Sequence, residues 1–337
     1  LSLEIGRMAK LAQGSCLVQY GETVVLCAVT VQDSPTHLPF FPLTVEYREK
    51  SYAAGKIPGG FFKREGRPGE KEILSARQID RPIRPLFPDG FMHETQVACF
   101  ILSADQENDA DVLALIGASV ALNMSKVPFN TMVASVRVGR IQGNWVVNPT
   151  FQQLAYSDVD VVVAGSADAI TMVEGGALEV PEAETLEGLQ VAHDAIKELC
   201  ALQDEFLEGH RVPDMEWSPV EPDAALKAKV EGLAAGKVAE ALNLRDKQER
   251  SQAMAAVTED VVATLNDEDD EFLENEKDVG EILRGIEKKT MRQQILTKGE
   301  RADGRGLDDV RAGRREGGVR ARPHGGARCR RGRTPAL

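Results

Sequence analysis

Residues 59–68 of this chain read GGFFKREGRP, a run in which glycines flank two adjacent aromatic residues and three cations. Glycine tolerates positive φ and a close approach of the backbone, so the run predicts a loop. Aromatic rings stack on unpaired bases of any sequence, and neighbouring Lys and Arg side chains neutralise backbone phosphates. A site for single-stranded nucleic acid is therefore predicted at Phe61, Phe62, Lys63, Arg64 and Arg67. The alternative is that both phenylalanines tuck under the loop as local core.

The stretch after this loop predicts a helix over residues 70–79. Arg77 and Arg81 are four positions apart, so their guanidinium groups are expected on one face. Pro82 is expected to end or bend the helix, and Arg84 follows it. Arginines gathered at a helix end predict a phosphate clamp, because the guanidinium is always charged and grips oxyanions with two donors. The alternative is ion pairing with carboxylates nearby, at Glu70, Glu72 or Asp80.

Short apolar stretches separated by turn residues predict strands at residues 15–18, 23–31, 43–47, 132–138, 145–147, 159–163 and 170–173. Asp109 is predicted to cap a helix whose apolar residues form one buried face. A longer helix is predicted from Pro181, with its inward residues at Leu186, Leu189, Ile196, Leu199 and Phe206. His193 lies near that stripe, and a hydrogen-bonded histidine at the edge of the core is the preferred interpretation.

The character of the sequence changes after residue 208. Residues 209–222 contain three prolines and predict a linker. Three helical patterns without strands follow, so a small all-α domain is predicted over residues 223–297. Residues 267–276 are strongly acidic, which is interpreted as a solvated loop or helix cap.

Net charge is unevenly distributed along the 337 residues, whose total is −13. Nine arginines and one glutamate lie from Arg311 onward, which leaves 31 basic and 52 acidic residues in the rest. An acidic chain binds RNA only where its cations are gathered, so the local pattern decides.

The five cysteines are scattered and never in CxxC spacing, and the five histidines are equally dispersed. Free buried thiols are expected, in a cytoplasmic protein, and no metal site is predicted within this chain. No apolar run approaches the roughly 20 residues that span a bilayer, so no membrane association is expected.

Four contiguous blocks resemble the first core domain of the polynucleotide phosphorylase (polyribonucleotide nucleotidyltransferase) family: FFPLTV at 40–45, YAAGKIPG at 52–59, FFKREGRP at 61–68 and IDRPIRPLF at 79–87. The likeness continues through IGAS at 116–119, VNPT at 147–150, VAG at 163–165, DKQER at 246–250 and RADGR at 301–305. The blocks stand in family order, and nearly the whole chain to about residue 311 is covered.

The resemblance implies an α+β fold, with a ribonuclease PH-like (ribosomal protein S5 domain 2-like) domain at 1–208 and a linker at 209–222. An all-α domain at 223–297 and the start of a second ribonuclease PH-like domain at 298–311 follow. Residues 312–337 keep several residues that are typical of the family, but Arg, Gly or Cys stands at the positions between them where the family has apolar residues. Because a strand whose inward residues become arginine cannot bury its face, this Arg-rich tail is predicted to be disordered.

The resemblance also implies an activity: phosphate-dependent degradation of RNA from its 3′ end, with release of nucleoside diphosphates and a role in mRNA degradation. It implies a homotrimeric ring, single-stranded RNA and inorganic phosphate as ligands, and a possible RNA-degradation complex as partner. Phe61, Phe62, Lys63, Arg64 and Arg67 would line a channel constriction, and Arg77 and Arg81 would help hold phosphate groups. Mg²⁺ and the main catalytic acids are expected in the second core domain. The second hypothesis is therefore a catalytically inactive fragment for RNA binding and trimer assembly.

Overall fold

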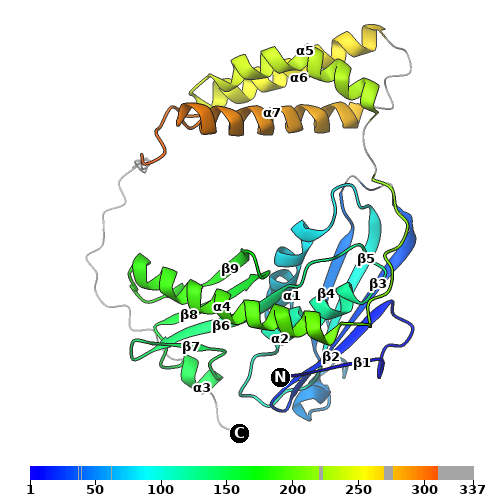
Figure 1. The fold of residues 1–337 in the computed structure, drawn as a ribbon, viewed down its shortest axis with the longest axis vertical. Coiled ribbons are helices and arrows are strands. Elements are labelled where there is room, and N and C mark those ends of the chain that lie inside the picture. Colours follow the sequence, from blue (N-terminus) through cyan, green and yellow to red (C-terminus); the bar gives the residue numbers. More distant parts are fainter. Residues whose placement is uncertain (37, 39, 62, 220–222, 269–275, 310–337) are drawn as a thin grey trace. The chain divides into compact units, whose positions relative to one another are not determined.

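The computed structural model describes residues 1–36, 38, 40–61, 63–219, 223–268 and 276–309. Contacts divide the chain into two compact units, unit 1 over residues 1–221 and unit 2 over residues 222–337, and each is described by itself. Both sheets and helices are present, which confirms the α+β class (Figure 1). The predicted tail at 312–337 lies outside the described residues.

One sheet of unit 1 has the strand order β1-β2-β3-β5-β4. Its strands are β1 (Ser2–Ile5), β2 (Gly14–Tyr20), β3 (Thr23–Pro35), β4 (Leu43–Glu49) and β5 (His93–Ser103). β4 runs parallel to β5, and the other pairs are antiparallel. The predicted hairpin of β2 and β3 and the predicted strand β4 are confirmed, whereas the sequence patterns did not indicate β1 or β5.

The second sheet has the order β7-β6-β8-β9, with every neighbouring pair antiparallel. Its strands are β6 (Ala134–Ile141), β7 (Asn144–Val147), β8 (Val159–Gly165) and β9 (Ile170–Ala177). All four were predicted, because each has alternating or continuous Val-rich sequence beside a turn of Gly, Asn or Ser.

α2 (Ala110–Asn123) packs against strands of both sheets (Figure 1). Every one of its residues is buried, so the prediction of a single buried face is wrong. A helix enclosed between two sheets has no solvent side, which explains why Ala, Val, Leu and Ile occur all round it. Asp109 is its N-cap residue, as predicted, but its side chain makes no capping hydrogen bond.

α4 (Glu182–Phe206) packs along the second sheet, and Pro181 is its N-cap residue. Its fully buried residues are Gly188, Ala192, Ile196, Cys200 and Gln203. Leu186 is 65% exposed, so the prediction that it faces inward is wrong. The stripe of buried residues on α4 is rotated by about one residue from the stripe that the sequence predicted. His193 is half-buried and its Nε2 lies 3.2 Å from the Ser166 carbonyl oxygen, as expected for a histidine at the edge of the core.

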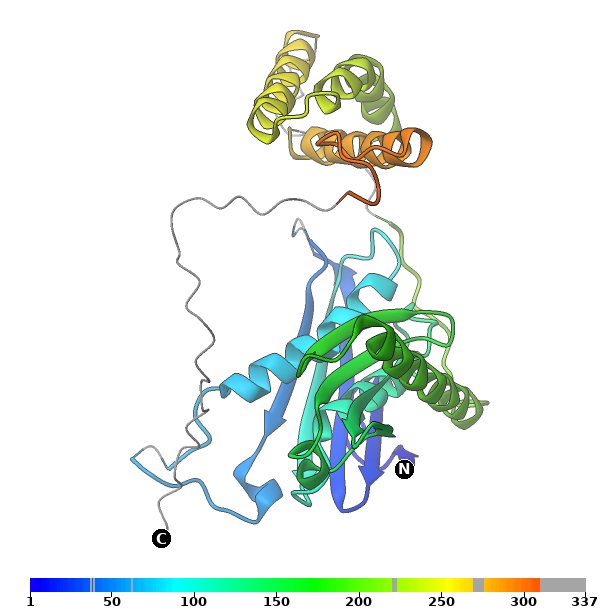
Figure 2. The same ribbon diagram turned by 90° about the vertical axis from the view of Figure 1, so that its left-hand side faces the viewer.

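α1 (Glu70–Ile83) lies beside β4, preceded by the short 3₁₀ helix η1 (Ser51–Ala54) and followed by η2 (Arg84–Leu86) (Figure 2). It ends one residue after Pro82, in agreement with the prediction. α3 (Phe151–Leu154) is a single turn after β7. The segment predicted to be a linker, residues 209–222, packs on the rest of unit 1 through two of its middle residues. Met215 N donates to the Lys126 carbonyl over 2.7 Å, and the Trp217 ring meets the Phe91 ring edge-on.

Unit 2 has three helices in its described part, in agreement with the three predicted helical patterns: α5 (Ala224–Leu242), α6 (Lys247–Glu268) and α7 (Glu276–Lys298). Their shared core includes Val230, Val238, Val261 and Val279. Residues 300–309 form a turn that follows α7. The side chains of the predicted acidic segment at 267–276 lie outside the described part.

Cys16, Cys27, Cys99 and Cys200 are free and buried, while Cys329 lies outside the described residues. Burial raises the pKa of the Cys16 thiol to about 12, so this group stays protonated at neutral pH. Within the part of the chain that the structure describes, no helix combines the length and apolar character needed to cross a bilayer.

Candidate nucleic-acid interface

The loop between η1 and α1 projects away from the two sheets, as Figure 2 shows for the blue segment before α1. Phe61 is 94% exposed, and Lys63, Arg64 and Arg67 are exposed as well. Phe62 lies outside the described residues. The alternative that Phe61 forms local core is therefore wrong, and this part of the loop presents an aromatic ring and three cations to its surroundings.

The backbone of the loop depends on its glycines. Gly60 and Gly66 have φ of 74° and 71°, in the left-handed region that glycine adopts without strain. Lys63 also has a positive φ, of 48°, which is uncommon for a residue with a side chain. These three residues give the loop an irregular backbone that no helix or strand could supply, and its cationic side chains are exposed.

Glu65 ties the middle of the loop to η1. Its carboxylate accepts hydrogen bonds from Ser51 N over 3.0 and 3.2 Å and from Ser51 Oγ over 3.1 Å. An ionised acceptor strengthens each of these bonds relative to a neutral one. Glu65, which the sequence suggested only as a neighbour of the cations, is therefore the anchor of the loop.

Glu72 ties the end of the loop to β4 and to the start of α1. Its carboxylate accepts from Gly69 N over 2.6 Å and from Glu49 N over 2.9 Å, and it pairs with Arg48 Nε over 3.3 Å. Arg48 Nη2 also donates to the Gly66 carbonyl over 3.3 Å. The sequence analysis missed Arg48 and suggested Glu72 only as an ion-pair partner of the α1 arginines. The sequence does hold one local signal for Glu72. It is the third residue after the N-cap residue Gly69, and an acid at this position can accept a hydrogen bond from the N-cap backbone.

The loop cations differ from the cations beneath the loop. Of the residues that the structure describes, none forms an ion pair with Lys63, Arg64 or Arg67, whereas Arg48 and Lys71 each pair with a carboxylate. Unpaired exposed cations on a fixed backbone attract phosphate groups at low energetic cost, since no existing ion pair must be broken. This contrast favours a binding role for the loop.

Arg77 and Arg81, predicted to act together, have different surroundings. Arg77 lines a groove of about 380 Å³ between β4 and α1. Arg81 instead pairs with Glu174 on β9. Arg84 pairs with Asp80 over 2.6 Å and donates to the Leu43 carbonyl over 2.9 Å, so the alternative of pairing with Asp80 is confirmed for Arg84. Glu174, the partner of Arg81, is not among the carboxylates that the sequence suggested.

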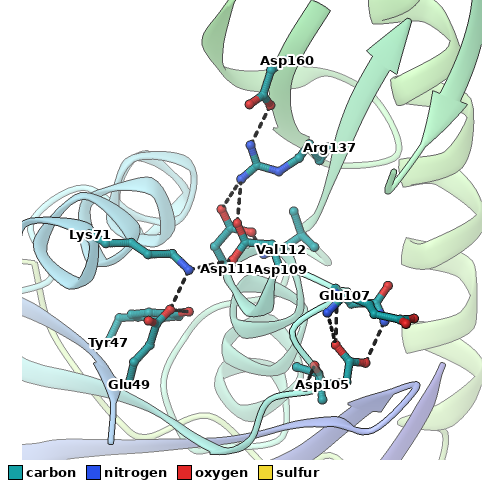
Figure 3. Close-up of polar contacts among 12 residues, drawn as sticks. Tyr47, Glu49, Lys71, Asp105, Glu107, Asp109, Asp111, Val112, Arg137 and Asp160 are labelled. Atoms are coloured by element: carbon teal, nitrogen blue, oxygen red, sulfur yellow. Dashed lines mark hydrogen bonds and ion pairs between the residues drawn. The ribbon is translucent and has the colours of Figure 1, made fainter. Parts of the chain in front are cut away.

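A network of charged side chains lies below α1, where Lys71 joins three elements (Figure 3). Its Nζ lies 2.9 Å from Glu49 Oε1 and 3.3 Å from Asp109 Oδ1, and Glu49 Oε1 also accepts from Tyr47 Oη over 2.8 Å. Burial alone would lower the pKa of Lys71, but the Asp109 and Glu49 carboxylates outweigh it and raise the pKa. Lys71 is therefore a permanently charged link between α1, β4 and the start of α2.

Arg137 on β6 extends the network to the second sheet. Its guanidinium lies 2.6 Å from Asp111, 2.6 Å from Asp160 and 3.3 Å from Asp109 (Figure 3). Burial and the neighbouring Asp109 charge raise the pKa of Asp111, and Arg137 partly offsets them. The network therefore holds both sheets to the N-terminal end of α2.

These carboxylates do not fit a Mg²⁺ site. Lys71 or Arg137 already engages each of Glu49, Asp109, Asp111 and Asp160. Within the described ranges no group of three or more His, Cys, Asp or Glu side chains is arranged to hold a metal ion. No step of a metal-assisted reaction is assigned to this part of the chain.

Three family models match the chain. Residues 1–128 match domain 1 of the 3′ exoribonuclease family, and residues 131–195 match domain 2 of the same family. Residues 225–306 match the RNA binding domain of polyribonucleotide nucleotidyltransferase. The first two matches lie in unit 1 and the third in unit 2.

Curated relatives match over the whole chain. Polyribonucleotide nucleotidyltransferase of Gemmatimonas aurantiaca is 55% identical over 337 residues, which are 100% of this chain and 46% of that protein. The enzyme of the same name from Thermomicrobium roseum is 46% identical, with 100% and 44% covered. That of Bacillus licheniformis is 44% identical, with 100% and 48% covered. The chain thus spans less than half the length of these relatives.

Among solved structures, a chain of the Archaeoglobus fulgidus exosome with RNA bound to the active site is similar, with a TM-score of 0.47 and 20% identity. The match covers 61% of this chain and 88% of that chain.

Proposed function

We propose that this chain, which belongs to the polyribonucleotide nucleotidyltransferase family, is the RNA-gripping part of a phosphate-dependent 3′-to-5′ exoribonuclease. In that reaction an oxygen of inorganic phosphate attacks the phosphorus of the last phosphodiester. The bond to the 3′-oxygen of the preceding nucleotide breaks, a nucleoside diphosphate leaves, and the shortened RNA keeps a 3′-hydroxyl. The reverse reaction polymerises nucleoside diphosphates.

The loop at residues 59–68 carries this proposal. Its exposed Phe61 offers a stacking face, and its exposed cations have no described ion pair that RNA would have to displace. Glu65 and Glu72 hold the base of the loop in place, so little order has to be gained when RNA binds. Binding at such an element is indifferent to base sequence, as a processive nuclease requires.

The arginines of α1 have a secondary role in the proposal. Arg77, which lines the groove beside β4, is available to hold a phosphate group. Arg81 can do so only by leaving Glu174, and both partners of that pair are about half exposed, so the exchange costs little. Mg²⁺, which neutralises developing charge in phosphoryl transfer, would be held outside the described residues.

The whole enzyme is proposed to act as a cytoplasmic homotrimer in mRNA degradation, by itself or within an RNA-degradation complex. For this chain by itself a second candidate stands beside the enzyme: a fragment that binds RNA and assembles but does not turn over. The observation that favours it is that the chain spans 46% of its Gemmatimonas relative.

Activity separates the two candidates. The chain is incubated with a 3′-labelled oligonucleotide, inorganic phosphate and magnesium, and release of nucleoside diphosphate is measured. We expect none, because arginines without metal-held acids do not complete phosphoryl transfer. Release of nucleoside diphosphate would assign turnover to this chain and reject the fragment.

Binding tests the loop. Lys63, Arg64 and Arg67 are replaced together by Ala, and the salt dependence of single-stranded RNA binding is compared with that of the parent. Loss of three phosphate contacts should flatten the slope of log K against log salt by about two. The matched control replaces three exposed cations elsewhere on unit 1, Lys10, Lys197 and Arg211, and should leave the slope nearly unchanged. An unchanged slope in the loop variant would move the RNA site elsewhere.

A further inference from the structure

α7 is amphipathic in an unusual way: one side is apolar and the other carries a row of cations. Val279, Ile282 and Leu283 are buried in the core of unit 2. Arg284, Lys288 and Arg292 recur every four residues and are all exposed. Residues four apart lie on the same side of a helix, about 6 Å apart along its axis. The three cations therefore form one straight row, which we call the α7 cation row.

In the described part of unit 2 the row has no ion-pair partner. Of the described residues, none forms an ion pair with Arg284, Lys288 or Arg292, although ion pairs occur elsewhere in the unit, such as that between Lys237 and Asp260. Like charges at i and i+4 repel and destabilise an isolated helix. The sequence thus keeps two adjacent like-charge pairs on one helix face, and binding an anionic chain would relieve this repulsion.

The helix that carries the row ends at a small cationic pocket. A cavity of about 50 Å³, between the ends of α5 and α7 and the following turn, has Arg245, Lys298 and Arg301 in its lining and Glu300 as its carboxylate. Arg245 Nη2 lies 3.6 Å from Glu300 Oε1, a loose contact between two well-exposed side chains. From Arg284 to Lys298 the helix rises about 21 Å, and the pocket lies at the C-terminal end of the helix that carries the row.

The pocket is built on a fixed backbone. Arg250 Nη1 donates to the Leu244 carbonyl over 2.8 Å and to the Ala302 carbonyl over 3.2 Å, which ties the turn after α7 to the end of α5. Gly304 has φ of 82°, and a side-chain carbon there would lie 2.7 Å from Arg245 Nε. The turn thus passes directly over the Arg245 guanidinium and holds it at the pocket.

We propose that the α7 cation row, with this pocket at its end, binds the sugar-phosphate backbone of single-stranded RNA. The proposal rests on RNA as the ligand of the family, and it names the surface of unit 2 that would hold it. A regular row of cations suits a polymer with one negative charge per repeat. A protein partner fits less well, because the cores of protein–protein interfaces are rich in aromatic and apolar residues, and the row has no aromatic member.

The test compares two charge-matched variants of the whole chain. The row variant carries Arg284→Ala, Lys288→Ala and Arg292→Ala. The control carries Lys227→Ala, Lys229→Ala and Lys237→Ala, which removes the same charge from exposed positions of α5. Binding of a single-stranded oligonucleotide is measured as a function of salt. We expect the row variant to flatten the slope of log K against log salt by about two, and the control to leave it nearly unchanged.

Three outcomes would overturn the proposal. An equal change in both variants would show that only the general charge of unit 2 matters, and no change in either would show that the row is not used. If the row variant loses binding to polyglutamate while RNA binding is unchanged, the surface takes an acidic protein instead. A variant with Arg284→Lys, Lys288→Arg and Arg292→Lys keeps the charges and must keep the slope; a flattened slope there would trace the effect to helix damage and reject the row.

Failure of this proposal and failure of the proposed function give different results. The loop variant with Lys63, Arg64 and Arg67 replaced by Ala is measured in the same series. A loop effect without a row effect leaves the RNA-gripping loop intact and rejects only the row. If only the row variant flattens the salt slope, the loop is rejected as an RNA site and the row is kept. If neither variant changes the slope although RNA still binds, both sites are rejected.

Discussion

Two regions of unit 1 use charge in opposite ways. Below α1, Lys71 and Arg137 are half-enclosed and each meets at least two carboxylates within 3.3 Å. On the loop only a few residues earlier in the chain, Lys63, Arg64 and Arg67 are exposed and have no ion-pair partner among the described residues. Paired charges inside a fold connect its elements, whereas unpaired charges on a fixed loop are available to a ligand. The first region should therefore respond to mutation through stability and the second through RNA affinity.

Arg137 gives the largest expected effect. Replacement by Met should lower the free energy of unfolding by about 3–5 kcal/mol, because Asp111, whose side chain is 4% exposed, would be left as an uncompensated buried charge. Urea unfolding measures this, and RNA affinity of the folded fraction should be unchanged. Adding Asp111→Asn to the variant should restore part of the loss. A loss below about 1 kcal/mol would mean that the network does not hold the sheets together.

The phenylalanines of the loop should respond in the opposite way. Phe61→Ala, and likewise Phe62→Ala, should weaken binding of single-stranded RNA by about 1–3 kcal/mol per stacked base while the melting temperature stays nearly constant. Both quantities are measured on the assembled protein, since the proposed channel needs three subunits. Phe91→Ala is the matched control: this ring is 1% exposed, so its loss should cost about 3–5 kcal/mol of stability. Lower stability with unchanged RNA affinity in the Phe61 variant would reject its stacking role.

Asp105 tests a third arrangement, a carboxylate held by neutral donors. Burial would raise the pKa of Asp105, but hydrogen bonds from Asn108 N and Nδ2 and from Glu107 N outweigh it and hold the pKa below its usual range. The unfolded pKa is about 3.9, so the stabilisation is complete above that pH and is lost as the pH falls through the lower folded value.

Asp105→Asn should accordingly destabilise the chain by about 1 kcal/mol at neutral pH, a value reduced for solvent screening. The difference between variant and parent should shrink toward zero in strong acid. Urea unfolding of both proteins at pH 7 and near pH 3 measures it, and a difference that grows in acid would contradict the assigned sign.

Replacement of Glu65, which anchors the loop to Ser51, has the smallest expected effect. Glu65→Ala removes the anchor to Ser51, so the loop should become mobile and RNA affinity should fall about threefold, which is under 1 kcal/mol. Thermal stability should change little, because the loop contributes no core. Glu65→Gln keeps an acceptor oxygen for Ser51 and should retain most of the affinity. Equal losses in both variants would show that the charge of Glu65, rather than its anchoring bonds, matters.

Features set by neighbouring residues were predictable from the sequence. The loop at 59–68 was recognisable because its glycines and cations are adjacent in the chain, and Gly60 and Gly66 do adopt the positive φ that defines it. The β2–β3 hairpin and the three helices of unit 2 were recognisable for the same reason. Hydrophobic periodicity and turn chemistry act over a few residues, so they can be read without knowing the fold.

The sequence by itself thus determined most of the helices and strands, the resemblance to the family and the composition of the loop at 59–68. The tertiary structure decided which charges are free. Glu65 finds Ser51 fourteen residues away, and Arg137 finds Asp111 across the two sheets. Arg77 lines the groove beside β4 whereas Arg81 pairs with Glu174 of β9, and α2 is buried all round because segments far apart in the chain enclose it. The physical reason is range: local sterics choose helix, strand and turn, but the partner of a charge and the covering of a helix are set by residues that meet only when the chain folds.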